Sequence, residues 1–127
     1  MAASTTEGGD LLKEFGRLVF GRFDQVLENL RSSLTSRDAP SDRAFREIIS
    51  SIPEPDRSLR IAQYGLEDFV HELMAIIEDS DTFSLVGQQS DGSVVDLKQF
   101  SESGLQAEQI YWQEEFSKKE SISQMIV

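Results

Sequence analysis

Two long stretches of this chain repeat their apolar residues at steps of three and four positions, a spacing that restricts them to amphipathic α-helices. The first stretch begins after Asp10, a residue suited to a helix N-cap, and runs to about Leu34. The second runs from about Asp56 to Asp79, and near its end the apolar residues almost encircle the helix. We therefore expect the second long helix to be central and deeply packed.

Two shorter helices are also predicted, so the fold is mainly helical. A helix is expected over about Asp42 to Ser51, before Pro53 and Pro55 break the chain. The sequence Ser103-Gly104-Leu105-Gln106 has the spacing of a capping box and predicts a last helix that ends near Lys119.

Between the last two predicted helices, the spacing of apolar residues changes to the alternation that is typical of an extended strand. Thr82 to Gly87 alternates as a strand does, and Val94 to Leu97 supplies the return strand. Asp91-Gly92 between them favours a type I′ turn. The sequence therefore predicts an α+β fold, predominantly helical, with three to four helices around one core and a β-hairpin between the third and fourth helices.

A length of 127 residues suits one domain. We expect residues 1–9 to form a disordered tail, residues 10–119 to form a single α+β domain, and residues 120–127 to form a C-terminal tail that either docks or frays. Gly16 and Gly21 interrupt the first long helix, and we expect them to let another element approach closely.

Negative charge is concentrated in the second half of the chain. Residues 61–117 hold twelve acidic residues and one basic residue, Lys98, whereas residues 1–60 are nearly balanced, and the net charge is −11. A field of one sign attracts partners of the opposite sign and repels nucleic acid and anionic lipid. An acidic surface that only keeps the protein soluble is the alternative interpretation.

Few residues suggest chemistry. There is no cysteine, which excludes thiolate sites and fits a cytoplasmic location, and the N-terminus lacks the features of a secretory signal. The single histidine, His71, lies one helical turn after Glu67 and Asp68, and we expect it to pair with one of these acids. We expect no enzyme activity, no cofactor and no metal site, because no nucleophile, phosphate-loop or metal motif accompanies that histidine.

The sequence therefore favours a non-catalytic protein that binds a basic protein partner, as immunity or antitoxin proteins and secretion chaperones do. We expect Trp112 to supply desolvated contact area unless it belongs to the core. The acids expected to steer and pair with the partner are Glu67, Asp68, Glu72, Glu78, Asp79 and Asp81. The alternatives are a regulatory domain that binds a small ligand or a metal at His71, and a subunit that self-associates, for example as a homodimer.

Overall fold

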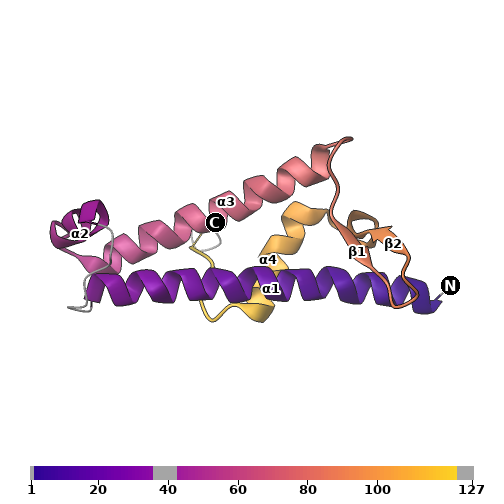
Figure 1. The fold of residues 1–127 in the computed structure, drawn as a ribbon, viewed down its shortest axis with the longest axis horizontal. Coiled ribbons are helices and arrows are strands. Elements are labelled where there is room, and N and C mark those ends of the chain that lie inside the picture. Colours follow the sequence, from indigo (N-terminus) through magenta and orange to yellow (C-terminus); the bar gives the residue numbers. More distant parts are fainter. Residues whose placement is uncertain (1, 36–42, 123–127) are drawn as a thin grey trace.

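The computed structural model describes residues 2–35 and 43–122. In these residues the chain forms four α-helices, a short 3₁₀ helix η1 and a two-stranded antiparallel hairpin (Figure 1). The elements are, in order, α1 (Ala2–Thr35), α2 (Arg43–Ser50), α3 (Pro55–Asp79), β1 (Val86–Gln88), β2 (Val94–Asp96), η1 (Leu97–Phe100) and α4 (Leu105–Phe116). The predicted α+β fold, with its hairpin between the third and fourth helices, is confirmed.

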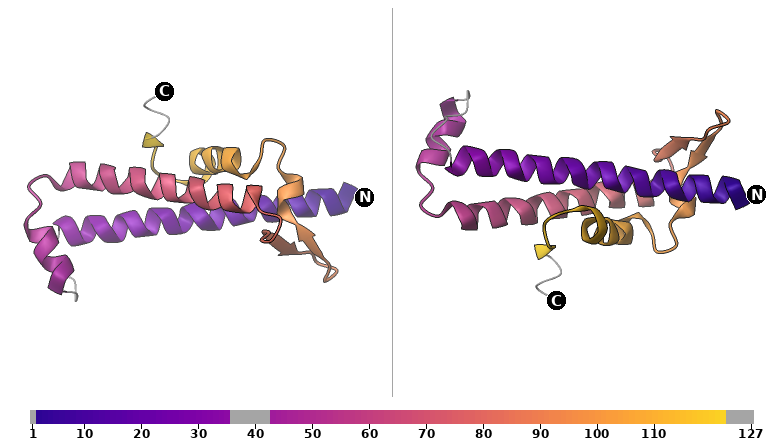
Figure 2. Two further views of the ribbon diagram at one scale, coloured as in Figure 1. Left: turned by 90° about the horizontal axis from the view of Figure 1, so that it is seen from above. Right: turned by 90° about the horizontal axis from the view of Figure 1, so that it is seen from below.

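The two long helices frame the molecule, and α4 packs against both. Helix α3 runs back along α1 and diverges from it toward the hairpin, with α4 beside the divergence (Figures 1 and 2). The core lies where these three helices and η1 meet. Its buried apolar residues are Leu12, Phe20, Phe23 and Leu27 of α1, Met74 of α3, Leu97 of η1, and Leu105 and Trp112 of α4. None of the described helices is long and apolar enough to cross a membrane.

The first helix begins at Ala2, well before Asp10, where the sequence placed its start. The backbone at Gly8 lies against the ring of Phe100, so closely that a β-carbon there would overlap the ring. Glu7 also accepts hydrogen bonds from the backbone N–H and the hydroxyl of Ser90. These contacts with η1 and the hairpin loop extend the helix through a segment expected to be a disordered tail. The apolar end at Met125 lies outside the described residues.

The hairpin turn differs from the predicted type. The N–H of Gly92 donates to the carbonyl of Gln89 at 2.9 Å, and the N–H of Gln89 donates to the carbonyl of Ser93 at 2.8 Å. Gly92 has a φ of 88°, whereas the φ of Asp91 is not positive. This is a three-residue loop with a type I turn and a glycine bulge. The type I′ prediction is wrong because it requires two consecutive residues with positive φ.

Gly16 and Gly21, which both lie within α1, have different surroundings. A β-carbon on Gly16 would overlap the indole ring of Trp112, so the absence of a side chain lets α4 approach. Gly21 is exposed, and in the part of the chain that the structure describes nothing lies within 4 Å of the position a β-carbon would take. The expectation of close approach is therefore confirmed at Gly16 and wrong at Gly21.

We expect Gly16→Ala to lower the free energy of unfolding by about 2 kcal/mol, because overpacking against Trp112 outweighs the gain in helix propensity. Gly21→Ala, the matched control in the same helix, should raise it by about 0.5 to 1 kcal/mol. Urea unfolding of both variants measures the difference. Equal effects of the two substitutions would contradict the close contact between α1 and α4.

Candidate functional site

Helix α3 carries most of the residues predicted to bind a partner. Pro55 and Asp56 lie in its first turn, and both residue types are favourable at a helix N-terminus. The helix ends at Asp79, and the backbone of Ser80 is extended. Its inward side, marked by the buried residues Gln63 and Met74, packs toward α1 and α4. The opposite side of α3 is exposed to solvent.

Three of the predicted acids share this outward side. Asp68, Glu72 and Asp79 are exposed and lie four and seven residues apart. At 100° per residue, these positions fall within about 40° of one another around the helix axis. Asp81 follows the end of α3 and is also exposed. The fold therefore gathers these acids at the surface, as a partner-binding role requires.

Large apolar side chains stand beside these acids. The exposed fractions are 73% for Ile61, 64% for Phe69, 40% for Leu73 and 60% for Ile76. We call these four residues, together with Gly65 between them, the apolar ridge of α3. Contiguous exposed apolar residues rimmed by charges are typical of a binding surface. The expected deep burial of α3 is wrong, because among the described residues only the side facing α1 and α4 is covered.

Glu67, although predicted at the partner surface, is buried with an exposed fraction of 1%. Its Oε2 accepts hydrogen bonds from Nε2 of Gln63 at 2.8 Å and from Nε2 of Gln113 at 3.1 Å. Its Oε1 accepts one from the hydroxyl of Ser121 at 3.0 Å, and the N–H of Ile122 lies 3.1 Å from both carboxylate oxygens. The side chain therefore joins α3, α4 and the segment after α4, and it does not reach the surface.

Glu78 also acts within the molecule. It is half-buried, and its Oε2 accepts a hydrogen bond from the N–H of Leu105, the first residue of α4, at 3.1 Å. Gly104, with a φ of 90°, occupies the N-cap and has no side chain to cap with. The predicted capping box at Ser103 is therefore wrong. The carboxylate that satisfies the start of α4 comes from the end of α3.

Trp112 belongs to the core, with an exposed fraction of 3%. Its ring meets the ring of Phe15 edge to face, with centroids 5.9 Å apart. The neighbouring Tyr111 is exposed, and a 2.9 Å ion pair between Lys13 and Glu115 links α1 to α4 nearby. Of the two interpretations of Trp112, the core interpretation fits this burial. The exposed aromatic residues on α3 are Tyr64 and Phe69, and Phe69 is the more exposed of the two.

His71 faces α4. Its Nδ1 lies 3.1 Å from Oε1 of Gln109, and Nε2 of Gln109 donates to the backbone carbonyl of Glu67 at 2.8 Å. The expected pairing with an acid of its own helix is thus replaced by a hydrogen bond between helices. Among the side chains that the structure describes, no three histidine, aspartate or glutamate groups are placed to share a metal ion.

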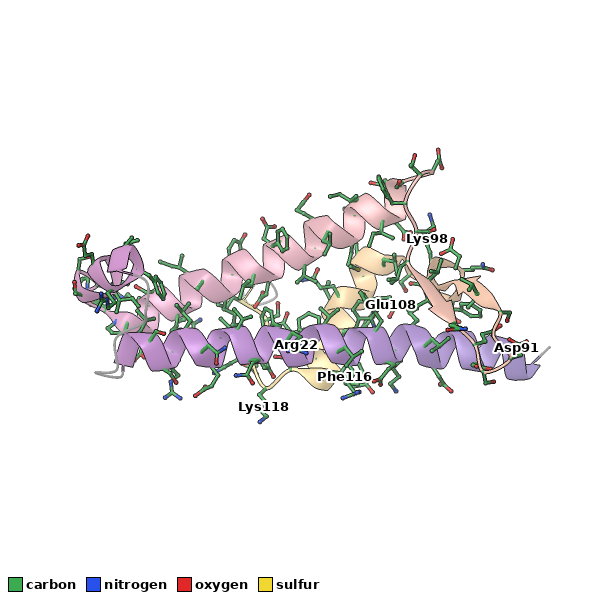
Figure 3. All side chains as sticks on the ribbon, in the orientation of Figure 1. Arg22, Asp91, Lys98, Glu108, Phe116 and Lys118 are labelled. Carbon is green, nitrogen blue, oxygen red and sulfur yellow. The ribbon has the colours of Figure 1, made fainter. Side chains whose placement is uncertain are left out.

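Positive charge on α3 is confined to its first turns, where Arg57 and Arg60 are exposed. After Arg60, α3 contains no further lysine or arginine. Lys98 donates from Nζ to the backbone carbonyl of Glu78 at 3.1 Å, beside the end of α3. Lys118, on the loop after α4, lies below α1 in the view of Figure 3, and its backbone N–H donates to Oδ2 of Asp24 at 2.8 Å. The outward acids of α3 therefore keep a locally negative surface.

The apolar ridge was missed by the sequence analysis, although its signal is present. Apolar residues that almost encircle a helix indicate either burial on every side or a second apolar face that another molecule covers. Among the described residues, α3 packs against one long helix, α1, and one short helix, α4, which cannot cover it on every side. Counting the available neighbours would have favoured the second interpretation.

Comparison of the chain with protein-family models, with curated proteins and with solved structures gave no match.

We expect Glu67→Ala to lower the free energy of unfolding by about 3 kcal/mol, because it leaves several buried donors without their acceptor. The N–H of Ile122 should lose protection in hydrogen exchange, since the carboxylate is its acceptor. Glu72→Ala, which removes an exposed carboxylate from the same helix, should change stability by less than about 0.5 kcal/mol. Unchanged protection of Ile122 in Glu67→Ala would contradict the anchoring role.

Proposed function

We propose that this protein is a non-catalytic interaction protein that binds a basic protein partner through the outward face of α3. The observation that carries the proposal is the juxtaposition, on one exposed face, of Asp68, Glu72 and Asp79 with the apolar ridge. An acidic surface needed only for solubility gives no reason for Phe69 and Ile76 to stand among the acids.

The two kinds of residue have separate tasks in binding. The acids attract a basic partner at long range and raise the rate of association, an effect that salt screens over roughly 8 to 10 Å. The ridge supplies apolar area, and burial of such area stabilises a complex by roughly 25 cal/mol per Å² before the costs of association. Phe69, rather than Trp112, is the aromatic residue placed to act as a hot spot.

The setting we infer is that of a small acidic protein that neutralises or escorts a basic one. Immunity and antitoxin proteins and secretion chaperones work in this manner, and the absence of cysteine fits a cytoplasmic location. The net charge of −11 disfavours nucleic acid as the partner.

Reversal of charge on the outward face of α3 tests the proposal. We expect the double variant Asp68→Lys/Glu72→Lys to lower the association rate with the partner at low salt by about tenfold or more, because long-range attraction becomes repulsion. The partner is first isolated on the wild-type protein from native lysate at low salt. Its binding to each variant is then followed by surface plasmon resonance over a salt series.

The matched control is Glu28→Lys/Glu114→Lys, which changes the net charge equally at exposed positions on α1 and α4. If both double variants slow association equally, the effect belongs to the net charge and the proposed face is wrong. Retention of the wild-type rate by Asp68→Lys/Glu72→Lys would exclude the face directly.

A further inference from the structure

We propose that the element bound by the outward face of α3 is an amphipathic α-helix with lysine or arginine beside its apolar side, and that Gly65 receives one of its large side chains. This inference rests on the proposed function and names the shape and chemistry of the partner. Four features of the face carry it: the backbone chemistry of α3, the spacing of the ridge, the gap at Gly65, and the acids beside the ridge.

The backbone of α3 excludes an extended partner. Within a helix, each backbone N–H and carbonyl is paired with another of the same helix, so the side of a helix offers no edge for strand addition. An extended peptide laid on α3 would leave backbone groups facing the ridge without hydrogen-bond partners, which is unfavourable. A helical partner satisfies its own backbone groups and presents only side chains.

The spacing of the ridge suits helix packing. Ile61, Gly65, Phe69 and Leu73 follow one another at steps of four residues, and Ile76 continues the row one turn later. Rows of side chains at four-residue steps are the ridges that pack between helices in the most common class of helix contact. The row from Ile61 to Ile76 is about 22 Å long at 1.5 Å per residue, so it matches a partner helix of roughly 15 residues.

Gly65 forms a gap in this row. It is exposed, and no atom of the described residues lies within 4 Å of the position a β-carbon would take. Its neighbours one turn away on either side are Ile61 and Phe69, both largely exposed. A large apolar side chain of a facing helix can therefore enter between them and reach the backbone of α3, as a knob enters a hole.

The acids decide which helix fits. Asp68, Glu72 and Asp79 lie along one flank of the ridge, so a facing helix needs basic residues beside its apolar row. A second copy of α3 would bring the same acids against them, which is unfavourable for two chains that each carry a net charge of −11. Charge complementarity thus favours a basic helix over self-association.

Gly21 of α1 provides the matched comparison. It is also an exposed glycine within a long helix, with nothing within 4 Å of a β-carbon. Its neighbours one turn away are Arg17 and Gln25, both polar and exposed. A leucine at either glycine improves helix propensity, and only a leucine at Gly65 fills the gap in the ridge.

The test uses two synthetic peptides of about 15 residues with identical leucine and lysine content. One places its leucines at helical spacing, and the other alternates leucine and lysine as a strand does. Calorimetric titration at low salt should give the helical peptide an affinity for the wild-type protein at least about tenfold higher. Equal affinities of the two peptides would overturn the helix inference.

Gly65→Leu should raise the melting temperature of the protein and weaken binding of the helical peptide by about tenfold, because the gap is filled. Gly21→Leu should also raise the melting temperature while leaving the affinity within about twofold of wild type. A Gly65→Leu protein that binds the helical peptide as the wild type does overturns the inference. So does a wild-type dimer, seen by light scattering, that Gly65→Leu dissociates.

Failure of this inference can be separated from failure of the proposed function by titrating Asp68→Lys/Glu72→Lys with both peptides. Suppose that the two peptides bind the wild type with equal affinity and that both bind this variant more weakly. That result would retain the acidic face as a binding site and reject the helical partner. Affinities that fall for neither peptide would reject the face itself, and with it the proposed function.

Discussion

The buried carboxylate of Glu67 is the interaction on which the rest of the arrangement depends. A carboxylate removed from water is strongly unfavourable unless hydrogen bonds replace its hydration. Here the donors come from α3 itself, from α4 through Gln113, and from the chain after α4 through Ser121 and Ile122. Because no single element could satisfy the group, its burial fixes α4 and the segment beyond it against one side of α3, and that choice determines which side of α3 remains outside.

The acids of α3 consequently divide into two groups with different consequences. Glu67 and Glu78 accept hydrogen bonds from other elements and stabilise the fold, whereas Asp68, Glu72 and Asp79 face solvent. Glu67 and Asp68 are adjacent in the chain, but a rotation of about 100° around the helix axis places Glu67 in the interior and Asp68 at the surface. Fewer acids are therefore available to a partner than the negative charge of the second half of the chain suggests. The exposed acids of α3 nevertheless lie together on one side of the helix.

The sequence predicted the features that depend on neighbours along the chain. The extents of α2 and α3 and the position of the hairpin follow from apolar periodicity and from proline. It failed where a distant residue decides the outcome. Burial of Glu67 requires donors from Gln113 and Ile122, which the local pattern around Glu67 cannot show, and the start of α4 is satisfied by Glu78 instead of by the local Ser103. Asp68, Glu72 and Asp79 are exposed, and their spacing along the helix places them on one side of α3.

The coexistence of acids and large apolar residues on one face is itself informative about the partner. Exposed residues such as Phe69 and Ile76 favour association with any apolar surface, including another copy of the same chain. The carboxylates beside them repel another acidic chain and weaken this self-association, while they attract a basic surface. The same charges therefore disfavour self-association and favour binding of a basic partner. A face that served only solubility would need the acids and not the apolar ridge. A self-associating face would need the ridge and not the acids. A face that carries both is suited to a partner with basic and apolar residues.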